Sequence, residues 1–357
     1  MKKTVYIMSA KYAPGHFSHI IAYYELFQAI GYAPMLYIDK NYRQFNKEYP
    51  KYRFAYTSQV VKAPDLLYIY NLSSVDSKIL KKFKEEKPEM KVFFVYHEPW
   101  YGAKGWVNDL IHKKESVTES IKAMGRFIFV RKLLKMSDKI ILPSKTALSN
   151  YKRYCSQIND KFTLFPLIFT DECGNDIHIE AKQYFSFIST ASNSKNFVQF
   201  LDYVKYKAKK SPEAKFQIAT RTDVSGYMDE ELKKLVKSKR LLLIHGHSLS
   251  NEEINRAYAA SNCTWMVYAR STQSGALCKS FMFGSPVIAS DIGSFREVVN
   301  ENNGIILNNG YSLENIDRAY EQIRNAQVQL SDGARKKFTD LFYWKKHENL
   351  FLSVLNS

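Results

Sequence analysis

Short apolar runs alternate with amphipathic stretches along almost the whole chain, and this alternation most constrains the fold. Apolar runs at 4–8, 35–39 and 66–70 open the pattern, and helix-like stretches lie between them. Strands that alternate with helices in this way form βαβ units around parallel sheets. The sequence therefore predicts an α/β fold of the doubly wound class.

The predicted elements fall into two blocks of this kind. In the first block, strands are expected at 4–8, 35–39, 66–70, 92–96 and 139–142, with helices at 16–29, 77–86, 117–135 and 146–154. In the second block, strands are expected at 184–189, 215–219, 241–244, 263–267, 287–289 and 304–307, with helices at 196–210, 229–237, 251–260, 275–283 and 313–326. Ser250 and Glu253 form a capping-box pattern at the start of one of these helices.

Two domains are expected for a chain of 357 residues, because a single core stops growing efficiently near that size. Residues 1–170 are predicted to form the first domain and 183–331 the second. The polar, poorly periodic segment 171–182 is interpreted as the linker. The tail at 332–357 has a helical pattern and is expected to pack back on the first domain.

The charge of the chain is concentrated in its first half. Lys and Arg number 52 against 35 Asp and Glu, a net charge of +17. Residues 1–170 hold 28 basic and 14 acidic residues, whereas the remaining chain holds 24 and 21. This asymmetry indicates a basic face that meets an anionic partner, which leaves nucleic acid, a phospholipid surface and a phosphorylated acceptor open.

The segment 104–145 is the most basic part of that half. Its ten cations are Lys104, Lys113, Lys114, Lys122, Arg126, Arg131, Lys132, Lys135, Lys139 and Lys145, interleaved with aromatic and aliphatic residues. Such a helix can lie on an anionic membrane, or it can pack its apolar side on its own sheet. No nucleic-acid-binding motif is present, so we expect a membrane surface and no nucleic acid.

Cysteine usage and apolar runs bound the setting. Cys155, Cys173, Cys263 and Cys278 form no CxxC pair and no cluster at metal-ligand spacing, which favours a reduced cytosolic setting. The apolar run 5–8 is too short for a signal peptide, and no run approaches 18 apolar residues.

Polar residues follow several predicted strands, at the ends where ligands bind in doubly wound sheets. Tyr12–His16 follows the first strand without a GxGxxG fingerprint, which argues against a nicotinamide or flavin enzyme. This turn is either a plain strand-to-helix connection or a loop whose backbone approaches a ligand. His97, Glu98, Pro99 and Trp100 follow the strand at 92–96 directly.

The second block has its own strand-end residues. Lys195 and Asn196 follow the strand at 184–189, and Arg221 follows the next strand. His245-Gly246-His247 follows the strand at 241–244, but no third metal ligand is near. Ser274-Gly275 opens a helix whose free backbone N–H groups suit an anionic phosphate.

Three of these motifs resemble retaining GT-B glycosyltransferases of the group 1, mannosyltransferase-like family. They are the HEP triplet at 97–99, Lys195-Asn196, and STQSGALCKSFMFGSPVIASDIGSFREVV at 271–299. The resemblance implies two Rossmann-like domains that face each other across a cleft, with a C-terminal helix that crosses back. It also implies transfer of a hexose from a nucleotide-sugar, without a metal or other cofactor.

Roles for individual residues follow from the same resemblance. His97 would contact and orient the donor sugar, and is the expected catalytic residue. Acceptor contacts are expected from His16, Glu98 and Trp100. Donor contacts are expected from Gly15, Lys195, Arg221, His245, Gly246, Ser274, Gly275 and Glu297.

The sequence departs from the family at three positions. Thr190 stands where a diphosphate-binding arginine is usual, and Ser271 and Lys279 stand where two glutamates are usual. Arg221 is expected to supply the missing positive charge. These departures keep two alternatives open: a catalytically silent accessory subunit, and another enzyme of this fold such as an epimerase or phosphorylase.

The expected function is that of a retaining hexosyltransferase in surface polysaccharide or glycolipid synthesis. Its partners would be a nucleotide-sugar donor, a glycan or lipid-linked acceptor and an anionic membrane surface. The expected location is the cytoplasm, at the inner face of the plasma membrane.

Overall fold

The computed structural model describes residues 2–12, 14–70, 73, 75–97, 99, 117–173, 182–269, 271, 273–308 and 311–356. Glu98, Trp100, the basic residues at 104–114 and most of the expected linker, 174–181, lie outside the described residues. The side chains at 14, 117–124, 126 and 127 are outside them as well.

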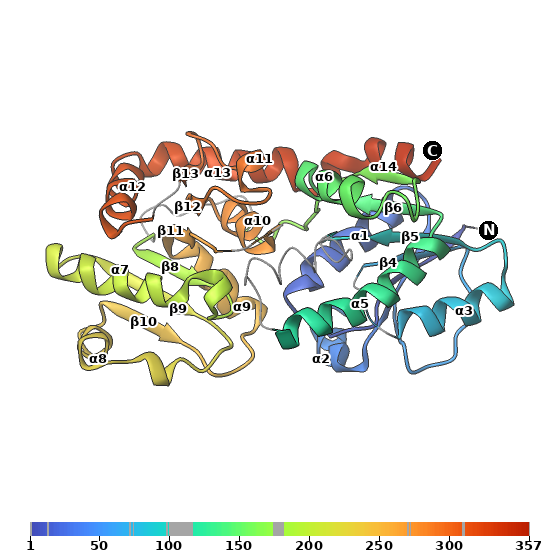
Figure 1. Cartoon of the computed structure of the whole chain (residues 1–357), viewed down its shortest axis with the longest axis horizontal. Coiled ribbons are helices and arrows are strands. Elements are labelled where there is room, and N and C mark those ends of the chain that lie inside the picture. Colours follow the sequence, from blue (N-terminus) through green and yellow to red (C-terminus); the bar gives the residue numbers. More distant parts are fainter. Residues whose placement is uncertain are drawn as a thin grey trace. The chain divides into compact units, whose positions relative to one another are not determined.

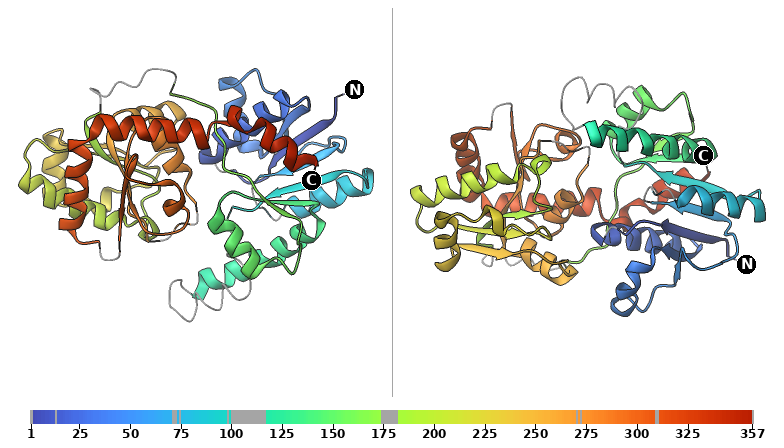
Figure 2. Two further views of the ribbon diagram at one scale, coloured as in Figure 1. Left: turned by 90° about the horizontal axis from the view of Figure 1, so that it is seen from above. Right: turned by 60° about the horizontal axis from the view of Figure 1, so that its bottom comes forward.

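The chain forms two compact units. Unit 1 comprises Met1–Thr170 and Tyr343–Ser357, and unit 2 comprises Asp171–Phe342. Each unit contains one parallel sheet with helices on both faces (Figures 1 and 2). The predicted α/β class with two parallel sheets is confirmed.

The sheet of unit 1 has seven strands in the order β3-β2-β1-β4-β5-β6-β7. All of its strand pairs are parallel. The strands are β1 (Thr4–Ser9), β2 (Ala33–Ile38), β3 (Phe54–Tyr56), β4 (Leu66–Ile69), β5 (Lys91–Val95), β6 (Lys139–Leu142) and β7 (Phe162–Leu164). The helices are α1 (Phe17–Ala29), α2 (Arg43–Glu48), α3 (Asp76–Glu86), α5 (Val117–Met136), α6 (Lys145–Tyr154) and α14 (Glu348–Asn356).

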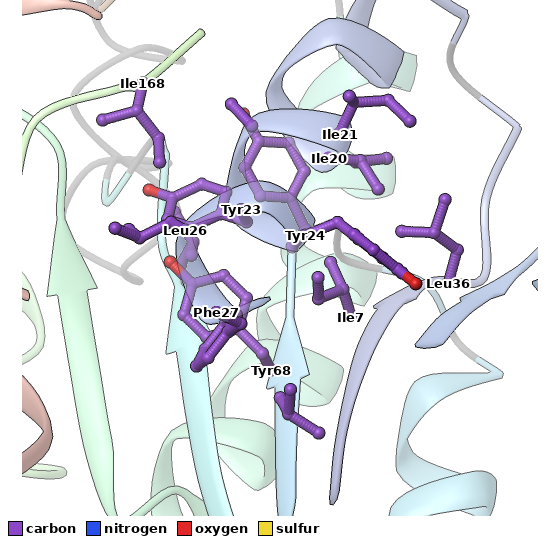
Figure 3. Close-up of a cluster of buried hydrophobic side chains, with 14 of the residues drawn as sticks. Ile7, Ile20, Ile21, Tyr23, Tyr24, Leu26, Phe27, Leu36, Tyr68 and Ile168 are labelled. Atoms are coloured by element: carbon purple, nitrogen blue, oxygen red, sulfur yellow. The ribbon is translucent and has the colours of Figure 1, made fainter. Parts of the chain in front are cut away.

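Two buried clusters hold unit 1 together, one on each face of the sheet. The first packs α1 and α14 on the sheet, and Figure 3 shows Tyr23, Leu26 and Phe27 of α1 beside Tyr68 of β4. The second cluster contains Leu80 of α3 and side chains of α5 and α6. Because both faces are covered, central strands such as β4 are buried along their whole length, as parallel sheets require.

The sheet of unit 2 has six parallel strands in the order β10-β9-β8-β11-β12-β13. They are β8 (Tyr184–Ile188), β9 (Lys215–Ala219), β10 (Leu241–Ile244), β11 (Ser261–Met266), β12 (Val287–Ser290) and β13 (Gly304–Leu307). The helices are α7 (Phe197–Lys210), α8 (Glu230–Lys237), α9 (Asn251–Ala259), α10 (Gly275–Met282), α11 (Phe295–Val298), α12 (Leu313–Asn325) and α13 (Gln327–Leu341). The capping box predicted at Ser250 and Glu253 is present at the start of α9.

The structure adds elements that the sequence analysis did not predict. The edge strands β3 and β7 have three residues each, too few to show an alternating pattern. The helical tail expected over 332–357 is not continuous, because α13 ends at Leu341 and the chain continues through a short 3-10 helix, η6 (Trp344–His347), into α14. Trp344, Phe351 and Val354 enter the first cluster of unit 1, so the last segment of the chain belongs to that core.

The chain passes between the units at two places that lie side by side. Tyr343 and Phe169 form an isolated parallel bridge, and the Trp344 N–H donates to the Phe169 carbonyl at 3.2 Å. The described ends of the expected linker, 171–173 and 182, belong to unit 2. Lys182 is buried there, and its ammonium donates to the Phe283 carbonyl at 2.7 Å and to the Ser285 hydroxyl at 3.0 Å.

Candidate functional site

The strand order of unit 1 reverses between β1 and β4. Helical crossovers leave to opposite sides of such a point, so a crevice opens there at the carboxyl ends of the strands. The chain places Gly15 and His16 just after β1, Tyr70 just after β4, and His97 shortly after β5. The structure therefore gathers three of the predicted site residues, Gly15, His16 and His97, at one edge of this sheet.

His97 is held by a backbone contact in this edge. Its Nε2 lies 3.0 Å from the carbonyl oxygen of Tyr70. A carbonyl can only accept, so Nε2 carries the hydrogen and Nδ1 remains an acceptor. Burial, reinforced by the nearby His16, lowers the pKa of His97 to about 3. His97 is consequently neutral near pH 7 and presents an acceptor to a hydroxyl group.

Aromatic and imidazole rings surround His97. The His16 ring centroid lies 5.8 Å from that of His97 and 5.8 Å from that of Tyr70. His19, one turn further along α1, is buried, and its Nδ1 lies 3.1 Å from the carbonyl oxygen of Ile168. Gly15 is exposed beside His16. Among the described residues, this edge therefore offers aromatic rings and the neutral imidazole of His97 rather than a fixed charge.

The strand order of unit 2 reverses between β8 and β11, and Lys195 lies at that point. It belongs to a short 3-10 helix, η4 (Asn193–Lys195), that follows β8. Its ammonium lies 3.8 Å from the centroid of the Tyr268 ring, which follows β11. The Trp265 ring nitrogen donates to the Lys195 carbonyl at 3.1 Å. These contacts fix a cation at the reversal point of the second sheet.

Asn196 completes this loop. Its backbone adopts the left-handed region at φ 50°, which asparagine tolerates better than most residues. Its side-chain amide donates to the Val267 carbonyl at 2.9 Å. The turn after β8 is therefore tied to the end of β11 from two sides.

Ser274 and Gly275 form the start of α10, as predicted. The Ser274 hydroxyl accepts from the Leu277 N–H at 3.4 Å and caps the helix. The N–H groups of Gly275 and Ala276, ahead of Leu277, have no intrahelical acceptor and point beyond the helix start. Two backbone donors and the positive end of the helix dipole thus lie at this edge.

Tyr268 connects Lys195 to this helix start. It is 1% exposed, and its hydroxyl has no hydrogen-bond partner among the described residues. Burial raises the pKa of its phenol to about 12, and the nearby Ser189 and Ser274 side chains partly oppose that rise. Tyr268 was not predicted from the sequence. Its position directly after a predicted strand was the available signal.

Arg221 and Thr190 lie at the same edge of the second sheet. Both are exposed, Arg221 after β9 and Thr190 after β8. The Ala191 N–H is bound by the hydroxyls of Thr220 and Thr222 instead. The role of Arg221 in binding an anion remains a prediction.

His245 and Gly246 follow the edge strand β10, two strands away from the reversal point. The His245 Nδ1 lies 3.3 Å from the Val224 nitrogen and 3.2 Å from a carboxylate oxygen of Asp223. Gly246 has φ +79°, a conformation that glycine adopts without strain. The loop is held from the β9 side and lies at the predicted edge.

His247 makes contacts within its own loop and with the start of α9. Its Nε2 contacts Glu253 at 3.2 Å, and this carboxylate raises the pKa of His247. Among the described residues, no three His, Cys, Asp or Glu side chains gather as metal ligands would.

Glu297 lies on α11, after β12, and is exposed. Its strand neighbours β11, so it shares the edge but lies one strand beyond Lys195 and Tyr268.

Lys279 and Ser271, at the positions where two glutamates are expected from the resemblance, both make contacts within unit 2. The Ser271 hydroxyl donates to the Gln273 carbonyl at 2.9 Å. The Lys279 ammonium is buried and donates to Asn251 at 2.7 Å and to Glu172 at 3.2 Å. Lys279 is therefore engaged inside unit 2. Glu172, which lies in the segment interpreted as a linker, was not predicted from the sequence to have any role.

Solved structures similar to the whole chain identify its fold. Sucrose-phosphate synthase from Thermosynechococcus elongatus is 12% identical, with a TM-score of 0.65 over 99% of this chain and 98% of that chain. Anabaena HepE in complex with UDP-glucose is 12% identical, with a TM-score of 0.69 over 99% of both chains. A variant of S. aureus TarM in complex with Fondaparinux, alpha-GlcNAc-glycerol and UDP is 10% identical, with a TM-score of 0.71 over 99% and 100%. The fold is that of the GT-B glycosyltransferases.

A family model narrows this class. Residues 182–325, most of unit 2, match the family described as "Glycosyl transferases group 1". The predicted resemblance to group 1 glycosyltransferases and the predicted enzyme class, a glycosyltransferase, are confirmed. No curated protein matches the chain by sequence. None of the helices in the described part of the chain combines the length and hydrophobicity that crossing a bilayer requires.

Proposed function

We propose that the protein transfers a hexose from a nucleotide-sugar to a glycan or lipid-linked acceptor, with retention of configuration, in surface polysaccharide or glycolipid synthesis. The observation that carries this proposal is the set formed by Lys195, Tyr268 and the Ser274-Gly275 helix start at the strand reversal of unit 2. Similar structures support it, because HepE is bound to UDP-glucose and TarM to UDP and alpha-GlcNAc-glycerol.

The donor diphosphate would bind at that set. The N–H groups at the start of α10 and the Lys195 ammonium provide hydrogen bonds and positive charge for an anion. A leaving nucleoside diphosphate gains negative charge during transfer, so the same groups would stabilise the transition state more than the ground state. Because these groups supply positive charge, we propose that no metal is required.

His97 would contribute from unit 1. Its neutral ring offers Nδ1 as an acceptor to a sugar hydroxyl, because Nε2 is committed to the Tyr70 carbonyl. An oriented acceptor fixes the sugar without adding charge near the reacting centre. Glu98 and Trp100 stay predictions for acceptor binding, as does His16.

Donor binding and turnover test the proposal. A panel of nucleotide-sugars is incubated with the protein, and release of nucleoside diphosphate and binding of each nucleotide are measured with and without a chelator. Turnover of one donor with chelator present supports the proposal. If no nucleotide binds and no donor is consumed, the transferase function is wrong.

One observation favours a second candidate, a catalytically silent glycosyltransferase-like subunit. Lys279 forms an internal ion pair where the family has a glutamate, so that position offers no carboxylate to a ligand. The same panel separates the candidates. Nucleotide binding without turnover, across all donors and a range of glycan and lipid-linked acceptors, would support the silent subunit.

We also propose that the protein associates with the inner face of the plasma membrane through unit 1. Ile128 and Phe129 of α5 are 68% and 41% exposed. Arg131, Lys132 and Lys135 of the same helix are exposed and make no ion pair with the described residues. Apolar side chains inserted among the headgroups and cations beside them suit an anionic lipid surface.

Vesicle sedimentation tests the membrane proposal. Binding should rise with the fraction of anionic lipid and fall with salt. Replacing Arg131 and Lys135 by Gln should weaken binding about thirtyfold, at roughly 1 kcal/mol for each cation. Replacing the exposed Val328 of unit 2 by Ser is the control and should leave binding unchanged. Binding that ignores lipid charge and salt would contradict the proposal.

A further inference from the structure

Glu172 lies just after the point where the chain first enters unit 2, and one of its carboxylate oxygens accepts three hydrogen bonds. Its Oε2 accepts from the side-chain amides of Asn251 at 2.6 Å and Asn255 at 2.9 Å, and from the Lys279 ammonium at 3.2 Å. The Lys279 ammonium also donates to the side-chain amide oxygen of Asn251 at 2.7 Å. Glu172, Asn251 and Lys279 thus form a closed triangle, with Asn255 as a fourth member.

This group is enclosed by the protein. The side chains of Glu172 and Lys279 are 15% and 10% exposed. The charge of Lys279 and the two amide donors keep the pKa of Glu172 below its ordinary value despite burial, so the carboxylate is ionised near neutral pH. Inside a protein such charged hydrogen bonds are strong, and a partly broken network is costly.

The partners of Glu172 come from the two helices whose starts border the candidate donor site. Asn251 is the first residue of α9, directly after the His245–Ser250 loop, and Asn255 lies one turn further on the same face. Lys279 lies one turn after Gly275, the first residue of α10, on the same face of that helix. One carboxylate therefore joins the first turn of α9 to the last turn of the short helix α10.

Asp171, the residue before Glu172, is linked through Arg335 to Met282, the last residue of α10. The Arg335 guanidinium pairs with the Asp171 carboxylate and donates to the Met282 carbonyl at 2.8 Å. The Glu172 N–H lies 3.4 Å from the Met282 sulfur. Residues 171–172 are thus attached to the last turn of the helix that carries the Ser274-Gly275 start.

We propose that Glu172 is a positioning residue for donor binding, which fixes the start of α9 against the short helix α10 and so holds the start of α10 in the arrangement that a nucleoside diphosphate requires. This inference rests on the proposed function, since it takes the start of α10 as the diphosphate site. Glu172 touches no reacting atom in this scheme. It acts through Asn251 and Lys279.

The chain contains a matched control for this ion pair. Asp317 of α12 is 17% exposed, pairs with the nearly buried Lys207 of α7 at 2.8 Å and accepts from the Tyr203 hydroxyl. Lys207 lies in the last turn of α7, at the opposite end of that helix from the η4 loop. Asp317→Asn therefore removes a similar carboxylate from the same unit without touching α9 or α10.

The first measurement is amide hydrogen exchange in the ligand-free full chain. Glu172→Gln should speed exchange at 252–256 and 276–280, whereas Asp317→Asn should leave these amides at the wild-type rate. The double variant Glu172→Gln/Lys279→Gln removes the unpaired buried charge and should fold, with the same faster exchange. Wild-type exchange at both helix starts in the double variant would overturn the proposal, whatever the protein binds.

The second measurement tests whether the arrangement of the two helices affects donor binding. Among UDP, GDP and ADP, the nucleotide that wild type binds best should bind Glu172→Gln about tenfold more weakly, a loss typical of coupled neighbours. The KM for the matching nucleotide-sugar should rise by the same factor while kcat changes little. Equal losses in Asp317→Asn would show a general stability effect and overturn the proposal. Wild type that binds no nucleotide would refute the proposed function instead, and the exchange result would still decide whether Glu172 holds the two helices.

Discussion

The strand-reversal points of the two units differ in what they offer to a ligand. In unit 1, His16, Tyr70 and His97 form an edge of rings, and burial keeps His97 neutral. In unit 2, Lys195 and the capped start of α10 form an edge with a fixed cation and backbone donors. The two parallel sheets thus present different groups at their edges, rings in unit 1 and a cation with backbone donors in unit 2. The difference comes from loop residues rather than from the fold.

The units also differ in whether the buried carboxylates described here are paired with a lysine. The carboxylates Glu172 and Asp317 of unit 2 each face a lysine. In unit 1, Asp76 at the start of α3 is 1% exposed, and its Oδ1 has no hydrogen-bond partner among the described residues. Burial raises the pKa of Asp76 to about 8. Glu172 and Asp317 of unit 2 thus have a counter-charge that Asp76 of unit 1 lacks among the described residues.

The largest expected effect concerns the fixed cation of unit 2. Lys195→Met should weaken binding of the preferred nucleoside diphosphate about hundredfold, because a charge-assisted hydrogen bond contributes roughly 2–3 kcal/mol. Isothermal titration calorimetry measures the loss. Lys209→Met, at an exposed lysine of α7, is the control and should bind like wild type. Unchanged binding in Lys195→Met would remove the basis for the comparison.

A second prediction concerns Asp76. Its pKa is raised in the folded state, so its proton stabilises the fold below the unfolded pKa near 4, and this contribution is lost as pH rises toward 8. From pH 5 to pH 7 the loss should be roughly 2 kcal/mol of unfolding free energy, since each pH unit counts about 1.4 kcal/mol at most. Asp76→Asn should abolish that slope in urea unfolding while it still accepts from the Ser73 N–H.

Asp65 provides the opposite sign as a control for Asp76. Hydrogen bonding by Lys87 and by the Thr4 backbone lowers the pKa of Asp65 to about 2. Its contribution is therefore present at neutral pH and lost as pH falls. If Asp65→Asn and Asp76→Asn changed the slope in the same direction, the assignment of an unpaired charge to unit 1 would be wrong.

A smaller effect is expected at the neutral edge of unit 1. His97→Ala should slow transfer roughly tenfold, the size of a lost neutral hydrogen bond and some loss of orientation, while nucleoside diphosphate affinity stays unchanged. Single-turnover rates and calorimetry on the same samples measure both. His247→Ala, at a half-exposed histidine of unit 2, should change neither. A parallel loss of nucleotide affinity in His97→Ala would mean that the two edges are not separate in function.

The smallest expected effect concerns the pH dependence of the transfer rate, to which His97 should contribute nothing near neutral pH. Because the pKa of His97 is about 3, the transfer rate should show no inflection from this residue between pH 5.5 and pH 8. Wild type and His97→Gln should therefore have pH profiles of the same shape, although the variant is slower. An inflection near pH 6.5 that vanishes in His97→Gln would show that the ring is charged during the reaction.

The sequence predicted the central strands because parallel strands buried on both faces produce unmistakable apolar runs, as at 66–70. It also predicted which polar residues follow the strands, since strand ends follow from the strands. Tyr268 was missed although the same reasoning applies to it. The edge strands β3 and β7 were missed because three residues cannot establish a period.

Glu172 was beyond sequence reasoning of this kind. Its partners Asn251 and Lys279 are 79 and 107 residues away along the chain, and its own segment is polar and without period. The departure at Lys279 was visible in the sequence, but its counter-charge could only be found in three dimensions. The break between α13 and α14 was also hidden, because both sides of it have a helical pattern.

The neighbouring chain passages at Phe169 and Tyr343 have a consequence for biosynthesis. Unit 2 is one continuous segment, whereas the core of unit 1 needs Trp344, Phe351 and Val354 as well as residues before 170. During synthesis the second unit can therefore complete its core while the first still lacks α14. Part of the apolar surface of the earliest-made sheet therefore stays uncovered until the last residues of unit 1 have been made.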